Sequence, residues 1–336
     1  MAPRGSDDQA GHELRVGGAA PTTMRAVKLV FAAFLTVVIA VGTGLAAPPA
    51  WRPARSVPVA RTEVAAAPLG REIAVVGGYL RSGRNTGRAD AFSPANNRWR
   101  RLPDLPVTVD HAMAAGARGR LYVLGGYAAG NVPLRKAYVL EGARWGALPA
   151  MPVPRAAAGA AVVGDKLYVV GGVEAPGRLA REALVFDLGD RRWSVIPGPR
   201  PREHLGTAAL GGLVYAVAGR TGGLDTNLDV VEAFDPRGAR WRALPPVPGK
   251  RGGTAAAAVA GQLLSVGGEE PGGTIDTVYA YSPRTRRWRR LSRLRTPRHG
   301  LGLVGWRGSA YALAGGPEPG LTVTGANEVL ALASPK

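Results

Sequence analysis

The stretch KLYVVGG, residues 166–172, joins a short apolar run to two consecutive glycines. The residues from Leu167 to Val170 are types that fit a buried pleated strand, and glycine is typical of a strand end. Related stretches occur at 71–78, 120–126, 213–219, 262–268 and 309–316, with the second small residue at 78, 126, 172, 219, 268 and 316. This period of 46 to 49 residues indicates a repeat architecture.

Tryptophan marks the same period independently. One tryptophan lies 26 to 28 residues before each of these glycine pairs: Trp51, Trp99, Trp145, Trp193, Trp241 and Trp288. A further strand that ends in a turn lies between the two markers, at 89–94, 136–142, 182–190, 229–238 and 277–284. An Ala/Gly/Val-rich run follows each tryptophan. With the Trp-led strand and the other two, each unit contains four expected strands, which is the content of one blade of a β-propeller.

The repeat resembles that of the Kelch family. In that family a blade carries a double glycine, a later Tyr or Phe, a spaced tryptophan and often an arginine before its first strand. In the third unit these residues are Arg155, Gly171, Gly172, Phe186 and Trp193. The resemblance covers residues 51 to about 333 and implies an all-β, six-bladed Kelch-type propeller. Ala218 departs from the pattern, because it replaces the first glycine of the fourth pair.

The two ends of the repeat region complement each other. The last unit has no terminal tryptophan, whereas Trp51 begins a strand, WRPARSVP, that precedes the first complete unit. We expect this strand to complete the sixth blade, beside strands near 300–306, 309–316 and 326–333, and so to close the ring without a free sheet edge. Residues 51–336 are then one propeller domain, expected to be a monomer.

An uncharged stretch at residues 29–46 precedes the repeats and follows Arg25 and Lys28. Its length suits an uncleaved transmembrane anchor, a signal peptide that starts at Met24 and is cleaved near Ala46 or Ala47, or a buried helix. The first two interpretations place the propeller outside the cytoplasm. Residues 1–28 are then a disordered cytoplasmic segment or a signal-peptide n-region. The excess of arginine over lysine, 38 to 5, with abundant Ala, Gly and Pro, is typical of a bacterial sequence.

The net charge of +19 favours anionic partners such as acidic polysaccharides, envelope polymers or phospholipid surfaces. The densest basic segment, residues 284–298, is either a polyanion-binding patch or the solvated outer edge of a sheet, and we favour the second interpretation. Nucleic acid is not expected, because no nucleic-acid-binding module is recognised. Cysteine is absent, which excludes disulfides, thiolate metal sites and cysteine nucleophiles.

The Kelch resemblance implies a ligand site at the mouth of the central channel. Sixteen residues before the first small residue of each pair lie Arg61, Val109, Arg155, Arg202 and Arg251, with Arg298 or His299 in the sixth unit. A ring of guanidinium groups would suit carboxylate or phosphate. The alternative is that each arginine bonds backbone carbonyls within its own blade.

Two other residue types occur near these positions. Tyr79 and Tyr127 follow two glycine pairs and could stack on a sugar ring or pack against a neighbouring blade. His111, His204 and His299 lie on alternate blades. The candidate ligand-binding residues are therefore Arg61, Tyr79, His111, Tyr127, Arg155, Arg202, His204, Arg251, Arg298 and His299.

No metal site, cofactor or catalytic residue is predicted. Three histidines at near-threefold positions could suggest a metal centre, but alternate blades are expected to face one another across a wide channel. Glu269 and Glu270 form an acidic pair, yet adjacent loop residues do not normally flank one substrate from two sides.

Two functional hypotheses follow. The first is a non-catalytic, exported binding module for a protein or an anionic envelope glycan. The second is a small-sugar enzyme of the sialate mutarotase (N-acetylneuraminate epimerase) type, which the Kelch resemblance also allows. The second hypothesis requires Arg202, Glu203 and His204 to meet polar groups of another blade in one pocket.

Overall fold

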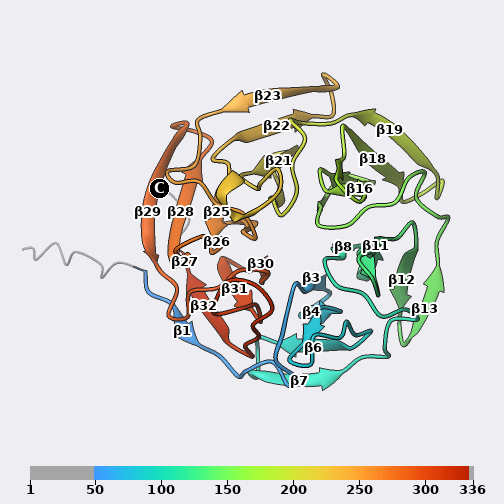
Figure 1. The fold of residues 1–336 in the computed structure, drawn as a ribbon, viewed down its shortest axis with the longest axis horizontal. Coiled ribbons are helices and arrows are strands. Elements are labelled where there is room, and N and C mark those ends of the chain that lie inside the picture. The colour runs from blue at the N-terminus through green and yellow to red at the C-terminus, as the bar shows by residue number, and fades with distance from the viewer. Residues whose placement is uncertain (1–48, 333–336) are drawn as a thin grey trace, which may run out of the picture. The chain divides into compact units, whose positions relative to one another are not determined.

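The computed structural model describes residues 49–332, which fold into a six-bladed β-propeller (Figure 1). The expected all-β, six-bladed architecture is confirmed. Each blade is a four-stranded antiparallel sheet whose first strand lies nearest the central axis. From the axis outward, the first blade contains β3 (Ala65–Leu69), β4 (Glu72–Val76), β6 (Ala89–Ser93) and β7 (Arg98–Arg101). The second contains β8 (Met113–Ala117), β9 (Arg120–Leu124), β12 (Ala137–Glu141) and β13 (Arg144–Ala147).

The next three blades repeat this order. The third contains β14 (Gly159–Val163), β15 (Lys166–Val170), β18 (Glu182–Asp187) and β19 (Trp193–Pro197). The fourth contains β20 (Gly206–Leu210), β21 (Leu213–Val217), β22 (Val231–Asp235) and β23 (Arg240–Leu244). The fifth contains β24 (Ala255–Val259), β25 (Gln262–Val266), β28 (Thr277–Ser282) and β29 (Arg287–Arg293).

The sixth blade combines strands from both ends of the described chain. It contains β30 (Gly302–Trp306), β31 (Ser309–Leu313) and β32 (Asn327–Ala331), with β1 (Arg52–Pro53) as the outer strand. The pairing of β1 with β32 is antiparallel, and Arg52 lies opposite Val329. Figure 1 shows this blue N-terminal strand beside the red C-terminal sheet.

Short elements lie in the connections between the main strands, both within blades and, for β2, between two blades. Within residues 49–332 they form four two-stranded pairs and one 3-10 helix, η1 (Leu224–Thr226). The pairs are β2 (Arg61–Thr62) with β5 (Tyr79–Leu80), β10 (Tyr127–Ala128) with β11 (Val132–Pro133), β16 (Val173–Ala175) with β17 (Arg178–Leu179), and β26 (Glu269–Glu270) with β27 (Gly273–Thr274). These connections reach the channel mouth.

The hydrophobic core lies between the blades. Buried residues at 49–332 form six apolar clusters, and each cluster joins two neighbouring blades. Between the third and fourth blades, for example, Tyr168 packs against Phe234 with ring centroids 5.9 Å apart. Because sheets stacked face to face share their apolar side chains, each blade depends on both neighbours for burial.

The repeated tryptophans add a polar link between blades. The indole Nε1 of Trp241 in the fourth blade donates to the carbonyl oxygen of Pro197 at 2.8 Å. Equivalent bonds to the end of the preceding blade are made by Trp99, Trp145, Trp193 and Trp288. The regular spacing of tryptophan along the chain is thus explained by its structural role, because each of these indoles links its blade to the preceding one.

The glycine pairs lie where the next blade crosses closely. Gly125 has φ +54°, and a Cβ built there would lie 2.1 Å from the carbonyl oxygen of Arg155. In the sixth blade the pair is Ala314–Gly315, because Gly315 N donates to Arg61 O as Gly126 N donates to Arg155 O. The expectation from the sequence, with the second small residue of this pair at position 316, is therefore wrong by one residue.

The predicted membrane segment at residues 29–46 lies outside the described residues. Within residues 49–332, no helix has the length and apolar character that a membrane crossing requires.

Candidate functional site

The five aligned arginines lie inside their blades. Each has an exposed fraction of at most 1% and donates a hydrogen bond to a backbone carbonyl of its own blade. Arg202, for example, donates to Ala216 O at 3.1 Å and also pairs with Glu232. The structure therefore does not bring these guanidinium groups together at the channel mouth. They are Arg61, Arg155, Arg202, Arg251 and Arg298, and buried Val109 takes the sixth position.

Two residues after each of these positions, one residue per blade adopts a left-handed backbone conformation, with φ between 49° and 62°. Backbone hydrogen bonds link neighbouring members: His111 N donates to Glu63 O at 3.0 Å, Ala157 N to His111 O at 3.1 Å, and His204 N to Ala157 O at 2.8 Å. We call these residues the channel-mouth ring. Its members are Glu63, His111, Ala157, His204, Gly253 and Gly300.

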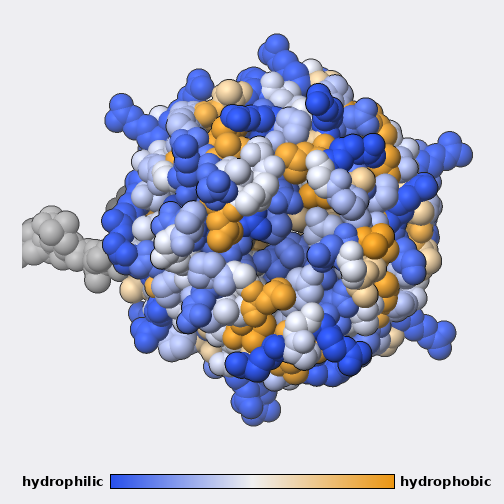
Figure 2. All heavy atoms as spheres, viewed as in Figure 1, coloured by the Kyte–Doolittle hydropathy of each residue, from blue (hydrophilic) through white to orange (hydrophobic). Residues whose placement is uncertain are grey.

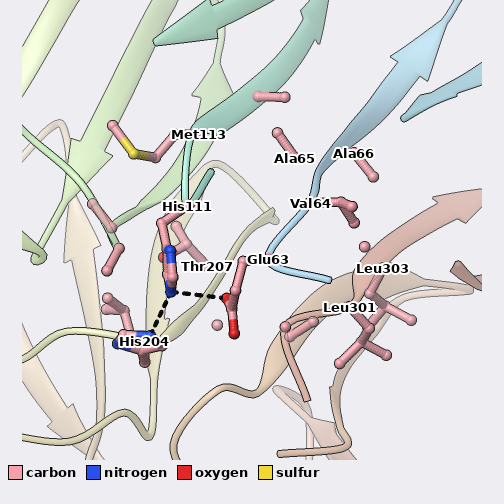
Figure 3. Close-up of a pocket in the computed structure, with 18 of the residues that line it drawn as sticks. Glu63, Val64, Ala65, Ala66, His111, Met113, His204, Thr207, Leu301 and Leu303 are labelled. Carbon is pink, nitrogen blue, oxygen red and sulfur yellow. Dashed lines mark hydrogen bonds and ion pairs between the residues drawn. The ribbon is translucent and has the colours of Figure 1, made fainter. Parts of the chain in front are cut away.

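Three side chains of the channel-mouth ring converge (Figure 3). The Nε2 atom of His111 lies 2.9 Å from Nε2 of His204 and 3.2 Å from Oε2 of Glu63. These residues come from the second, fourth and first blades, and their ligand atoms all lie within 4.8 Å of one another. We call them the Glu63–His111–His204 cluster.

Further polar groups hold this cluster in place. The Nδ1 atom of His111 lies 2.6 Å from Oδ1 of buried Asp110. On the other side, Nδ1 of His299 lies 3.1 Å from Oε1 of Glu63, and Nε2 of His299 lies 3.1 Å from the carbonyl oxygen of Glu318. The imidazole of His111 and the carboxylate of Glu63 are thereby fixed in orientation.

Arg220 connects the cluster with the fifth blade. Its Nη1 lies 2.8 Å from Oε1 of Glu269, and its Nε lies 3.5 Å from Oε1 of Glu203. The same Glu203 oxygen lies 3.4 Å from Nδ1 of His204. A network of alternating charges thus extends across one side of the mouth.

The protonation preferences of the two histidines differ. Burial lowers the pKa of His111, but the carboxylates of Glu63, Asp110 and Glu203 together outweigh burial, so the net shift is upward. Burial lowers the pKa of His204, and the charges of His111 and Arg220 add to that effect. Burial alone would raise the pKa of Glu63, but His111 and His299 hold it well below its usual range. His111 can therefore donate its Nε2 proton to a neutral His204.

A hollow of about 700 Å³ opens over the cluster on the side of the second to fourth blades. Tyr79 and Tyr127 form part of its wall, with ring centroids 6.0 and 5.4 Å from that of His111. Figure 2 shows the ring with its central hollow and with hydrophilic side chains projecting from its rim. A smaller cavity of about 140 Å³, also lined by the cluster, continues between the innermost strands.

The expectation that a wide channel separates the histidines is wrong for His111 and His204. The intervening blade contributes only Ala157 to the channel-mouth ring, and the Nε2 atoms of the two imidazoles lie 2.9 Å apart. His299 joins through Glu63. Of the residues predicted at the mouth, the structure brings together Tyr79, His111, Tyr127, His204 and His299.

Sequence reasoning missed Glu63, Asp110 and the role of Arg220. A signal for Glu63 was present, because it lies two residues after Arg61, as His204 lies two residues after Arg202. Aligning the units at that offset would have grouped Glu63 with both histidines. Asp110 and Arg220 gave no such signal, because the corresponding positions of the other units carry different residue types.

The six-sheet ring with paired glycines and a buried arginine in five blades defines a propeller built from Kelch-type repeats. The model of the KLHDC2/KLHL20/DRC7 Kelch-repeats domain matches residues 63–250 and 149–316. The chain therefore belongs to the Kelch-repeat family.

Two curated relatives share this similarity. Kelch-like protein terF of Aspergillus terreus is 29% identical over 290 residues, which cover 79% of this chain and 63% of that protein. Human Kelch repeat and BTB domain-containing protein 12 is 31% identical over 212 residues, covering 59% of this chain and 28% of its own length. The matched region is less than two thirds of either relative.

Proposed function

We propose that this protein is a binding module that recognises a partner protein at the mouth of the propeller channel. Kelch propellers are generally protein-interaction modules. Rigid blades hold irregular loops at one end of the channel, which is where such folds usually place binding residues.

The observation that carries this proposal is the position of exposed apolar side chains. Among residues 49–332, three large apolar side chains are exposed: Val132, Val195 and Leu321. Leu321 lines the mouth hollow, and Val132 follows Asn131, which lines it too. Exposed apolar groups beside tyrosines and a concave surface are typical of protein-binding patches.

The charge distribution favours a protein segment over an anionic polymer at this site. The aligned arginines are buried, and the buried network at the mouth joins the carboxylates of Glu63, Asp110, Glu203 and Glu269 with the single guanidinium group of Arg220. Arg178 also lines the hollow, and further exposed arginines lie on outer strands such as β29. A polyanion would therefore meet the rim of the ring, where binding depends on salt.

We also propose that the propeller acts outside the cytoplasm of a bacterium. This rests on the uncharged stretch at 29–46 and its preceding basic residues Arg25 and Lys28. A reporter that is active only outside the cytoplasm, fused after residue 47, tests the point. It should be active when residues 29–46 are present and inactive when they are removed.

The binding proposal is tested by site-specific crosslinking with the full chain in its native cell. A photo-crosslinking amino acid replaces Leu321, Val132 or, as a control on outer strand β19, Val195. We expect one discrete adduct from positions 321 and 132 and none of that mass from 195. The captured protein must then bind the purified full chain directly, and Leu321→Asp must weaken this binding at least tenfold while Val195→Asp leaves it unchanged.

The proposal fails if position 195 yields the same adduct or if Leu321→Asp binds the captured protein as the unaltered chain does. Comparable thermal unfolding of the two Asp variants would confirm that both are folded.

The convergence of Glu203 and His204 with groups of other blades supports a small-sugar mutarotase as a second candidate. Arg202, however, bonds within its own blade, so Arg220 would be the cation for a sugar carboxylate. Faster mutarotation of N-acetylneuraminate, followed by NMR and lost in Glu203→Gln, would support this candidate. A rate equal to that in buffer would exclude it.

A further inference from the structure

We propose that Glu63, His111 and His204 form a binding site for one late first-row divalent metal ion, of the Zn²⁺ class, at the channel mouth. Three potential ligands from three different blades point at one small volume (Figure 3). The site is independent of the partner-protein proposal.

The separations between the ligand atoms fit this class of ion. Zinc bonds imidazole nitrogen and carboxylate oxygen at about 2.0–2.2 Å, so neighbouring ligands of a tetrahedral site lie about 3.3 Å apart. The observed separations from His111 Nε2 are 2.9 Å to His204 Nε2 and 3.2 Å to Glu63 Oε2. All three ligand atoms lie within 4.8 Å of one another, so side-chain movement of His204 and Glu63 would close the set around an ion that replaces the proton between the imidazoles.

The backbone presents these three ligands in a fixed and costly conformation. Glu63, His111 and His204 all have positive φ, between 49° and 52°, which costs a non-glycine residue on the order of 1 kcal/mol or more. The remaining ring members are Ala157, Gly253 and Gly300, none of which carries a ligand atom in its side chain. Ala157 shares this conformation, with φ 51°, so the conformation belongs to the ring position, and the three ligands differ from the other members by the donor atom that each carries.

A second layer of groups leaves the correct atoms free for the ion. Asp110 contacts Nδ1 of His111 at 2.6 Å. Nδ1 of His204 makes no hydrogen bond within residues 49–332, and Glu203 lies 3.4 Å from it. Carboxylates on Nδ1 direct the Nε2 lone pair toward a metal and increase its basicity. His299 likewise holds one oxygen of Glu63 and leaves Oε2 toward the histidines.

The set of donor atoms selects the class of ion. Two imidazoles with one carboxylate suit zinc and its neighbours, whereas calcium and magnesium prefer oxygen ligands. The side chains of Glu63 and His111 are 11% and 13% exposed, and the two histidines of the cluster line the mouth hollow. Three protein ligands facing such a hollow leave a fourth position for water or for a ligand entering from the mouth.

The test uses the purified full chain, stripped with a chelator and titrated with Zn²⁺ against a chromophoric competitor. We expect one equivalent to bind tightly, and Co²⁺ to give the visible absorption of a low-coordinate site. Loss of an outer contact at metal sites typically weakens binding 10- to 100-fold, so His111→Ala and His204→Ala should each weaken it by more than about 100-fold. Glu270→Gln, at an exposed residue of the mouth loops, serves as the carboxylate control and should bind normally.

The site is disproved if the unaltered chain binds no tight equivalent, or if the two histidine variants bind zinc as Glu270→Gln does. Imidazole ¹⁵N NMR of the unaltered chain provides a test that does not depend on variant folding. Zinc must shift the Nε2 signals of two histidines strongly. The Nε2 signal of His299, which is hydrogen-bonded to the carbonyl oxygen of Glu318, must stay unchanged. Uniform or absent shifts would also overturn the proposal.

Discussion

The Nε2 atoms of His111 and His204 lie 2.9 Å apart, although 93 residues separate the two histidines in the chain. Both occupy the same position of their repeats, in the second and fourth blades, and Ala157 occupies that position in the blade between them. Repetition of one backbone position around an axis therefore brings different side chains into contact. Any ligand site here is formed by the ring as a whole, because no single blade contains it.

The buried arginines are expected to stabilise their blades. In Arg298→Ala, Glu328 loses its guanidinium partner, and Ala312 O loses its donor. Breaking a buried ion pair in this way typically costs about 3–5 kcal/mol. Denaturant unfolding should show a loss of this size, and Arg298→Lys should not restore it, because lysine cannot reproduce the planar donor geometry. Exposed Arg287→Ala on β29 is the control, and equal stability of the two alanine variants would contradict the prediction.

The tryptophan links between blades should contribute measurably to stability. Trp241→Phe keeps an aromatic ring but removes the hydrogen bond to Pro197 O. We expect the free energy of unfolding to fall by about 1 kcal/mol more than in Trp306→Phe, because the structure shows no indole hydrogen bond for Trp306 among residues 49–332. Equal losses in the two variants, measured in urea, would show that the bond has no net effect.

Gly125 is predicted to be the least replaceable of the glycines that begin a pair. A Cβ there would lie 2.1 Å from Arg155 O, compared with 2.5–2.8 Å from the corresponding carbonyl for Gly77, Gly171 and Gly267. Gly130→Ala is the matched control, since it also has positive φ but nothing within 4 Å of a new Cβ. The melting temperature should fall much further for Gly125→Ala. Similar melting temperatures would mean that backbone conformation, and not the close approach, determines the cost.

Asp187 should titrate at unusually low pH. A hydrogen bond from Lys166, with others from the backbone N–H groups of Asp190 and Gly189, lowers its pKa to about 2. Because the folded pKa lies below the unfolded one, the associated stabilisation is present above the unfolded pKa and is lost as the pH falls toward about 2. Carboxyl NMR should show Lys166→Met raising this pKa partway, since the backbone donors remain. An unchanged value would rule out the lysine as the main cause.

The fold was predictable because its signals repeat. Each unit carries the glycine pair needed for close crossing and the tryptophan that bonds the preceding blade, so one physical requirement appears in the sequence several times. Ala314 shows the limit of this approach. This alanine occupies the first position of the sixth pair, where φ is 57°. Because two glycines follow it, residue type alone places the pair one residue too late.

The candidate site was less predictable, because it depends on which repeated positions face the axis. The spacing placed His111 and His204 near the mouth but did not determine how far their side chains reach. Arginine as a residue type suggested anion binding, whereas its burial depends on the packing of neighbouring strands. Residues such as Asp110 become visible only when the blades are assembled in three dimensions.

The channel-mouth ring also has a consequence for protein engineering. Its six positions, one in each blade, share one backbone conformation but differ in the space that a new side chain would find. Ala157 is hydrogen-bonded through its backbone to both His111 and His204, whereas a Cβ at Gly300 would lie only 2.5 Å from a carboxylate oxygen of Glu63. Position 157 is thus the most suitable ring position for an additional functional side chain. The propeller then serves as a scaffold in which the side chains at the channel mouth are replaced one repeat at a time.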